Sequence, residues 1–369
     1  MNKLPDWADV ILIPLISILL AMGISALVIL AIGGNPLHAL AVMIEGAFGT
    51  SSNLGYTLFY TTNFIFTGLS VAIAFHARLF NIGSEGQAAL GGLGVALVCL
   101  YIPFPHWSLA LVAAFIAASL FGAAWAAIPA YLQVKRGSHI VITTIMFNAI
   151  AAALLNYLLV NVINLKTSQE PATARFPAVT HIPKLSDILN PLGIPFSTTS
   201  PANIALPIAL LVAFLVWLVV WRTRLGYELR AFGQSETAAR YAGINAFRIT
   251  MIVMLASGAL AGLYAINKVM GESERLVMGA VEGAGFIGIA VALMGRNHPV
   301  GVVLAALLFG ALTQGGQILS QDQSAAIPVE LVVVIQALVI MFTGALDEMV
   351  RMPLVRLFAL LRPAGRTGG

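Results

Sequence analysis

The sequence has 369 residues, of which 59% are hydrophobic and only 9% are charged. A soluble domain is about half apolar and a quarter charged, so this composition excludes a soluble globular protein and predicts an all-α bundle of transmembrane helices. The net charge of +4 arises from Lys and Arg residues in short segments between apolar runs rather than on one stripe, which argues against nucleic acid as a partner. A single cysteine, Cys99, excludes an intramolecular disulfide and a cysteine metal cluster.

Apolar runs separated by charges, Pro and Asn predict about ten membrane-spanning helices in one permease domain over residues 1–369. The first run is about twice as long as the core of a signal peptide, so we expect it to stay uncleaved as the first span. In chain order the predicted spans cover 10–32, 56–77, 84–102, 107–132, 139–162, 203–221, 249–268, 280–295, 299–319 and 327–346.

The distribution of positive charge predicts the orientation of the bundle. When the spans are threaded alternately with the N-terminus inside, 14 Lys and Arg residues fall on that side and 5 on the other. Cytoplasmic loops carry the excess of Lys and Arg, so both termini are predicted to lie in the cytoplasm.

Two connections are long enough to do more than turn the chain. Residues 163–202, on the predicted outer (periplasmic) side, contain six prolines, which favours an irregular, partly ordered cap. The predicted cytoplasmic loop, about 222–248, contains a segment with the signals of a short helix: Ser235 as its cap, Glu236 in its first turn and Gly243 at its end. Such a helix outside the membrane is a natural docking element for a soluble partner.

An internal similarity points to a repeat. The segment NIGSEGQ at 81–87, followed by an apolar run, is similar to MGAVEGAG at 278–285, which is followed by another. In the threading above the two helices start from opposite sides of the membrane, as in inverted-topology repeats. Because Gly, Ala and Val are frequent in this chain, chance similarity is the other reading.

No sequence of the form GxxxxGK[ST] is present, so the chain is not expected to hydrolyse ATP, and no cofactor is expected. The glycines in apolar runs are interpreted as sites of close helix packing. This interpretation covers Gly91, Gly92, Gly94, Gly258, Gly262, Gly279 and Gly283.

A few polar groups within or beside the predicted spans are candidates for function, since buried polar groups in membranes face the bundle interior, a partner or an aqueous route. Asn63, Asn148 and Asn156 can line a route for a neutral polar solute or join helices, and the nearby Phe64 can stack on a planar ring or simply pack. Glu85 and Glu282 stand near the starts of spans, where a carboxylate is favoured, with either a gating or a structural role.

Four motifs together resemble the permeases of bacterial ABC importers for branched-chain amino acids, simple sugars and nucleosides, and most closely the guanosine and nucleoside uptake permeases. These motifs are FNIGSEGQ at 80–87, ITTIMFN at 142–148, ARYAGI at 239–244 and GFIGIAVALMGRNHPVG at 285–301. The resemblance implies an inner-membrane permease with a cytoplasmic ATPase subunit, a second related permease and a periplasmic or lipid-anchored binding protein. It also implies that QSETAARYAGI contacts the ATPase, through Glu236, Ala238, Ala239, Arg240 and Gly243.

Three alternatives to a nucleoside ABC permease remain open. A simple-sugar or branched-chain amino acid permease shares the helix pattern. An ion-coupled secondary transporter needs ionisable groups near the middle of the membrane, and only Glu85 and Glu282 come near to that. A membrane-embedded enzyme lacks any combination of nucleophile, base and acid in the sequence.

Overall fold

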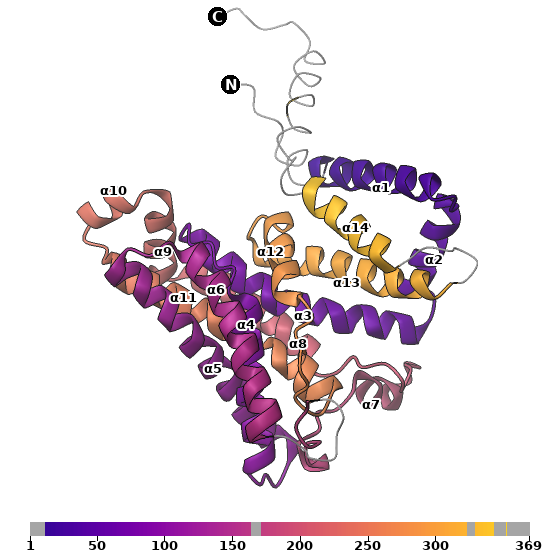
Figure 1. The fold of residues 1–369 in the computed structure, drawn as a ribbon, viewed down its shortest axis with the longest axis horizontal. Helices are drawn as coiled ribbons and strands as arrows, with labels where there is room; N and C mark the ends of the chain where they lie inside the picture. Colours follow the sequence, from indigo (N-terminus) through magenta and orange to yellow (C-terminus); the bar gives the residue numbers. More distant parts are fainter. Residues whose placement is uncertain (1–11, 164–170, 323–328, 343–351, 353–369) are drawn as a thin grey trace, which may run out of the picture. The chain divides into compact units, whose positions relative to one another are not determined.

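The computed structural model describes residues 12–163, 171–322, 329–342 and 352, and within these ranges every regular element is a helix (Figure 1). The predicted all-α class is therefore confirmed. The helices are α1 (Ile13–Ala31), α2 (Pro36–Phe48), α3 (Ser51–His76), α4 (Ser84–Tyr101), α5 (Trp107–Arg136), α6 (Ile140–Tyr157), α7 (Leu185–Leu189), α8 (Ala205–Arg222), α9 (Arg224–Gln234), α10 (Glu236–Tyr241), α11 (Ala246–Gly262), α12 (Ala284–Met294), α13 (Pro299–Gln321) and α14 (Val329–Ile340).

Six helical segments of the described chain are long and apolar enough to cross a membrane, so the protein is a multi-pass membrane protein. They are Ser51–His76, Trp107–Arg136, Ile140–Val162, Ala205–Arg222, Ala246–Glu272 and Pro299–Gln321. The other four predicted spans coincide with α1, α4, α12 and α14, and α12 is a shorter apolar helix of only 11 residues. The count of ten spans and the cytoplasmic location of both termini stay predictions, and both termini lie outside the described residues.

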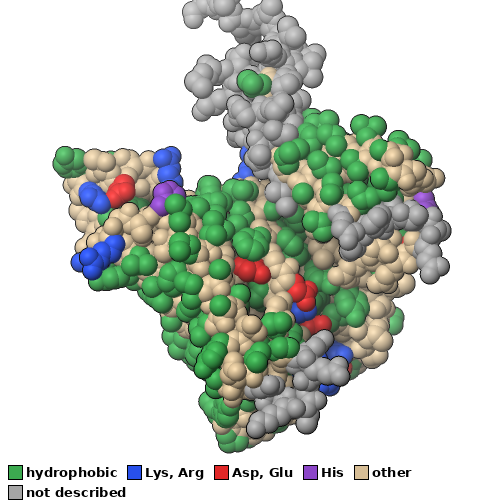
Figure 2. All heavy atoms as spheres, in the orientation of Figure 1, with side chains coloured by type: hydrophobic (Ala, Val, Ile, Leu, Met, Phe, Trp, Pro, Cys, Tyr) green, Lys and Arg blue, Asp and Glu red, His purple; other side chains and the backbone are tan. Residues whose placement is uncertain are grey.

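The helices group into two compact units, residues 47–314 and residues 1–46 with 315–369. The single permease domain over 1–369 stays a prediction. Figure 2 shows apolar side chains spread over the face in view, with few charged ones among them, as expected for helices in contact with lipid.

In the larger unit, α3 is the most deeply buried span, with 83% of its most apolar window inside the fold. It packs against α11 and α12. Several of its residues are threonines, and their hydroxyls donate to carbonyls one turn earlier: Thr61 to Thr57 at 2.7 Å and Thr67 to Asn63 at 3.2 Å. These bonds within the helix let polar side chains lie in the core without unsatisfied groups.

Close helix packing is confirmed for the predicted glycines of α4 and α11. A Cβ built on Gly91 would overlap the backbone of Gly262, and one built on Gly258 would overlap the carbonyl group of Gly122. The same interpretation was wrong for Gly279 and Gly283, which have no neighbouring atoms within 4 Å at the Cβ position and have positive φ angles of 72° and 80°. They form turns before α12, because glycine alone adopts such angles without strain.

The smaller unit has its own core, formed by Ile29 of α1, Ala39 of α2, Leu319 of α13 and Ile335 of α14. Helix α2 was not predicted from the sequence. Its start carries a local signal all the same: Asn35 Oδ1 accepts from the backbone N–H groups of residues 37 and 38, at 3.0 and 3.3 Å, and Pro36 occupies the first helical position.

The two long connections have different structures. Over its described part, 171–202, the predicted outer loop contains α7 and two 3₁₀ turns, in agreement with an irregular cap. The loop bonds to the segment before α12, where the Thr173 N–H donates to the Leu276 carbonyl at 2.9 Å and the Leu276 N–H donates to Thr173 Oγ1 at 3.0 Å. The predicted cytoplasmic loop forms both α9 and α10.

Candidate functional site

The carboxylate of Glu85 joins the start of α4 to the start of α12. Its Oε1 accepts from the Gly283 N–H at 2.9 Å and its Oε2 from the Gly285 N–H at 2.8 Å. The first N–H groups of a helix have no partner within the helix and carry partial positive charge, so a carboxylate stabilises them. The two similar segments, 81–87 and 278–285, therefore meet at their helix starts, although the inverted repeat itself stays a prediction.

The start of α4 is held in turn by Asn148 of α6. Asn148 Oδ1 accepts from the Gly86 N–H and its Nδ2 donates to the Ile82 carbonyl, both at 2.9 Å. Asn81 adds bonds to Gln87 at 2.9 Å and to Ser257 of α11 at 2.8 Å. The amide of Asn148 is thus used on both ends to fix α4, which is a helix-joining role.

A cavity of about 430 Å³ lies among α4, α6 and the segment before α12. Three residues predicted as functional, Glu85, Asn148 and Asn156, line it together. Most of its remaining wall is small or apolar, with Gly86, Ala89, Gly92, Ala152, Ala153, Leu276, Val277 and Met278. Its volume falls within the roughly 300–1,000 Å³ range of small-molecule pockets.

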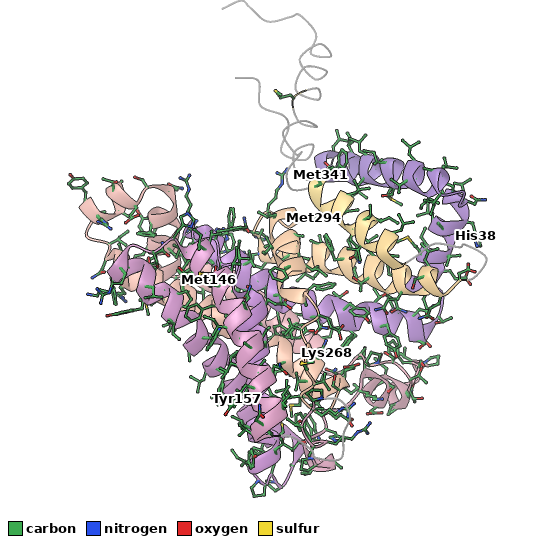
Figure 3. All side chains as sticks on the ribbon, viewed as in Figure 1. His38, Met146, Tyr157, Lys268, Met294 and Met341 are labelled. Carbon is green, nitrogen blue, oxygen red and sulfur yellow. The ribbon has the colours of Figure 1, made fainter. Side chains whose placement is uncertain are left out.

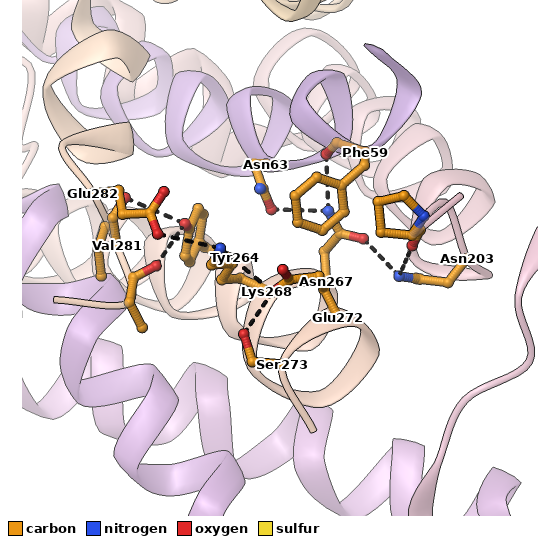
Figure 4. Close-up of polar contacts among 12 residues, drawn as sticks. Phe59, Asn63, Asn203, Tyr264, Asn267, Lys268, Glu272, Ser273, Val281 and Glu282 are labelled. Carbon is orange, nitrogen blue, oxygen red and sulfur yellow. Dashed lines mark hydrogen bonds and ion pairs between the residues drawn. The ribbon is translucent and has the colours of Figure 1, made fainter. Parts of the chain in front are cut away.

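Asn63 and Phe64 are not among the residues that line this cavity. Asn63 is buried, and its Oδ1 accepts from Asn267 Nδ2 at 2.8 Å (Figure 4). Asn267 also donates to the Phe59 carbonyl at 2.9 Å and accepts from Asn203 Nδ2 at 2.9 Å. This chain of amides joins α3, the residues just before α8 and the π-helix Ile266–Glu272 that follows α11. The predicted role of Asn63 and Phe64 in a route stays a prediction.

Glu282 lies beside Lys268, a cation that was not predicted from the sequence to be functional. The Lys268 side chain, labelled in Figure 3, is only 12% exposed. Its Nζ is 3.3 Å from carboxylate oxygens of both Glu272 and Glu282 (Figure 4). It also lies 5.9 Å from the centre of the Phe59 ring. Glu282 itself is 63% exposed, so this ion pair ties a solvent-facing carboxylate to the core.

The segment before α12 is fastened at several points. The Tyr264 hydroxyl donates to the Ala280 and Val281 carbonyls at 3.0 and 3.2 Å, while Glu85 and Lys268 hold Gly283 and Glu282. Tyr264, Asn267 and Lys268 were missed in the sequence because they lie at the end of a predicted span. Their spacing, at i, i+3 and i+4, is the signal that could have placed them on one face of a helix.

The predicted helix in the 222–248 loop is present as α10. The Ser235 hydroxyl accepts from the Ala238 N–H at 3.2 Å, Glu236 pairs with Arg240, and Gly243 ends the helix with φ of 82°. Ala239 is buried and Tyr241 is 91% exposed. The local structure is therefore confirmed, whereas contact with an ATPase stays a prediction.

Comparison with known proteins identifies the family. Residues 53–344 match the family described as branched-chain amino acid transport system / permease component. The chain is 35% identical to the guanosine ABC transporter permease protein NupP of Bacillus subtilis, covering 91% of this chain and 93% of NupP. It is 33% identical to the nucleoside ABC transporter permease protein NupB of Lactococcus lactis, covering 90% of each chain.

It is also 34% identical to the glucose ABC transporter permease protein TsgB13 of Haloferax volcanii, covering 89% of this chain and 86% of TsgB13. Weaker matches include a second guanosine permease protein of the same Bacillus strain and a second nucleoside permease protein of the same Lactococcus strain. The chain therefore belongs to the family of permease components of branched-chain amino acid transport systems.

Proposed function

We propose that this chain is the permease subunit of an ATP-driven ABC importer and forms part of the route for a nucleoside or a related small polar solute. The observation that carries the proposal is the cavity lined by Glu85, Asn148 and Asn156, beside the starts of α4 and α12. Similarity to guanosine and nucleoside permeases supports the substrate class. No bond is made or broken in the solute by this chain.

The walls of the cavity suit a solute with a flat apolar face and a few polar edges. The small side chains of Gly86, Ala89, Gly92, Ala152 and Ala153 leave space for a ring to lie against α4 and α6. Asn156 is exposed, and an amide both donates and accepts hydrogen bonds without the desolvation cost of a charge. The site thus orients a planar solute while binding it weakly, which allows its release.

The segment 276–283 is the proposed moving part. It lines the cavity and is tied to the core through Glu85, Tyr264 and Lys268. The segment is proposed to exchange between two states, and a ligand or partner shifts this equilibrium only if it binds the two states with different affinities. In this proposal the breaking and remaking of the Glu85 and Glu282 contacts distinguishes the two states.

A second permease is proposed to complete the route. Only 17% of the most apolar window of the α6 span is buried, and Asn156 is exposed on it. An exposed polar side chain in a membrane-spanning segment is unfavourable against lipid, so this face suits a protein partner or an aqueous path. The existence of second permease proteins beside the relatives in Bacillus and Lactococcus supports a related but distinct subunit.

The energy is proposed to come from a cytoplasmic ATPase subunit that contacts α10, and the solute from a periplasmic or lipid-anchored binding protein at the opposite face. The permease then lies in a bacterial inner membrane with both termini in the cytoplasm. The excess of Lys and Arg on the α10 side of the predicted topology supports this orientation.

Uptake by the reconstituted complex tests the function. We expect ATP-dependent accumulation of labelled nucleosides in proteoliposomes. We expect Ala153→Trp to reduce it by about tenfold or more, because the indole takes the space in the cavity that the solute would occupy. The matched control is Ala149→Trp, at an exposed position of α6 that does not line the cavity. Equal uptake by both variants would contradict the route, and accumulation of glucose in place of nucleosides would favour the sugar permease.

Coupling through α10 has a separate test. Gly243→Val puts a branched side chain at φ of 82°, where it costs about 1–2 kcal/mol, and Arg240→Glu breaks the pair with Glu236. We expect either change to lower solute-stimulated ATP hydrolysis by about tenfold at an unchanged amount of purified complex. Gly193→Val, a positive-φ glycine in the predicted outer loop, is the control. Parent-level stimulation in both α10 variants would refute the coupling role.

A further inference from the structure

An apolar groove runs between α8 and the first turns of α13 within the larger unit. It has a volume of about 460 Å³ and is lined by Leu210, Phe214 and Trp217 of α8 with Pro299, Val300 and Val303 of α13. The Phe214 and Trp217 rings stack with their centres 5.8 Å apart. Val300 is 60% exposed, so the groove is open to the surroundings of the helix pair.

A basic hollow lies beyond the end of α8. It has a volume of about 920 Å³ and contains Arg222, Arg224 and Arg230, against the single carboxylate of Glu228. Tyr227 lines it as well and brings a hydroxyl group, whereas the Thr223 hydroxyl donates to the Val219 carbonyl. Three guanidinium groups with one phenolic hydroxyl nearby form a suitable environment for a phosphate.

Arg222 connects the two concavities. It lines the basic hollow, and its guanidinium carbon lies 5.3 Å from the centre of the Trp217 ring, which lines the groove. An arginine stacked on an aromatic ring keeps its N–H groups free for an anion in the plane of the guanidinium. One end of a ligand in the groove therefore reaches Arg222 directly.

We propose that this pair of concavities binds one anionic phospholipid, with an acyl chain in the groove and the phosphate among Arg222, Arg224 and Arg230. The groove lies on apolar membrane helices, where the surrounding molecules are lipids rather than water-soluble ligands. The hollow has a net positive charge and lies on the predicted cytoplasmic side, where anionic lipids attract Lys and Arg. Ser235, which caps α10, and Ala238 of α10 also border the hollow, so the bound headgroup lies beside the proposed coupling helix. The lipid site does not depend on which solute is carried.

Photolabelling of the complete complex in nanodiscs tests the site. The probe is phosphatidylglycerol with a photoreactive group on one acyl chain, and labelled peptides are identified by mass spectrometry. We expect label on α8 and the start of α13, at least about fivefold above that of a phosphatidylcholine analogue with the same group. Equal labelling by the two lipids would overturn the proposal.

Paired variants separate the two halves of the site. Arg222→Gln with Arg224→Gln is expected to lower labelling by phosphatidylglycerol about thirtyfold, and Val300→Trp, which fills the groove, about tenfold. The controls are Arg136→Gln at the exposed end of α5 and Leu304→Trp, an exposed α13 position outside the groove. Elution on gel filtration establishes that each variant is assembled. Labelling that persists in both site variants, or that develops only after removal of the ATPase subunit, would show that the hollow is not a lipid site.

Discussion

Replacing Glu85 with alanine is expected to lower the rate of ATP-driven uptake by about tenfold or more and to lower the stability of the purified complex. The carboxylate accepts from the N–H groups of Gly283 and Gly285. Its removal leaves both without a partner at the start of a helix, and each unsatisfied buried group costs about 1–3 kcal/mol. Because about 1.4 kcal/mol changes an equilibrium constant tenfold, even part of this cost strongly lowers the population in which the segment before α12 is held in place.

Glu85→Gln separates the loss of an acceptor from the loss of the side chain. The amide retains one acceptor oxygen, so we expect an intermediate loss of uptake and faster hydrogen exchange at one of the two glycines only. Glu274→Gln serves as the matched control, because Glu274 pairs with His181 and does not line the cavity. Parent uptake and parent exchange rates at residues 283–285 in Glu85→Ala would contradict the role of Glu85 in holding this segment.

Gly258→Leu is expected to prevent assembly of the permease. A Cβ at this position would overlap the carbonyl oxygen of Gly122 and lie 2.5 Å from the Ala126 Cβ. Overpacking of a core costs about 1–3 kcal/mol or more, and here the obstacle is the backbone of α5, which cannot change rotamer. Since α11 packs against α3, α4 and α5, separation of α11 from α5 disturbs the whole core of the larger unit.

The yield of monodisperse protein on gel filtration measures this effect, and we expect it to fall by about tenfold or more. Gly23→Leu is the control, because Gly23 is an exposed residue of α1 with no atom within 4 Å of the Cβ position. Both variants introduce the same side chain into an apolar helix, so hydrophobicity and helix propensity are matched. Similar yields for the two would show that the α5–α11 contact does not control assembly.

The candidate site was only partly accessible from the sequence. Glu85, Asn148 and Asn156 were selected as polar groups in apolar surroundings, and the fold brings them to one cavity. The same criterion selected Asn63, which instead bonds to Asn267 in a buried chain of amides. Polarity within an apolar run indicates that a residue needs a partner, but it does not reveal whether that partner is a solute or another helix.

The role of a glycine likewise depends on the tertiary structure and not only on the neighbouring sequence. Gly258 and Gly279 look alike in the sequence, since each is one of two glycines four residues apart in or beside an apolar run. In the fold, Gly258 touches the backbone of α5, whereas Gly279 stands free in a turn with positive φ. Only the presence or absence of a neighbouring helix distinguishes close packing from a turn.

The sequence by itself determined the all-helical membrane class, the positions of six spans and the ends of α10. These properties follow from local composition and from capping by residues a few positions apart, such as Ser235 and Ala238. Tertiary structure alone decided that Glu85 binds Gly283, 198 residues away, and that Asn63 binds Asn267, 204 residues away. Contacts at such separations depend on how whole helices pack, and no pattern within a single apolar run encodes which helix will supply the missing donor.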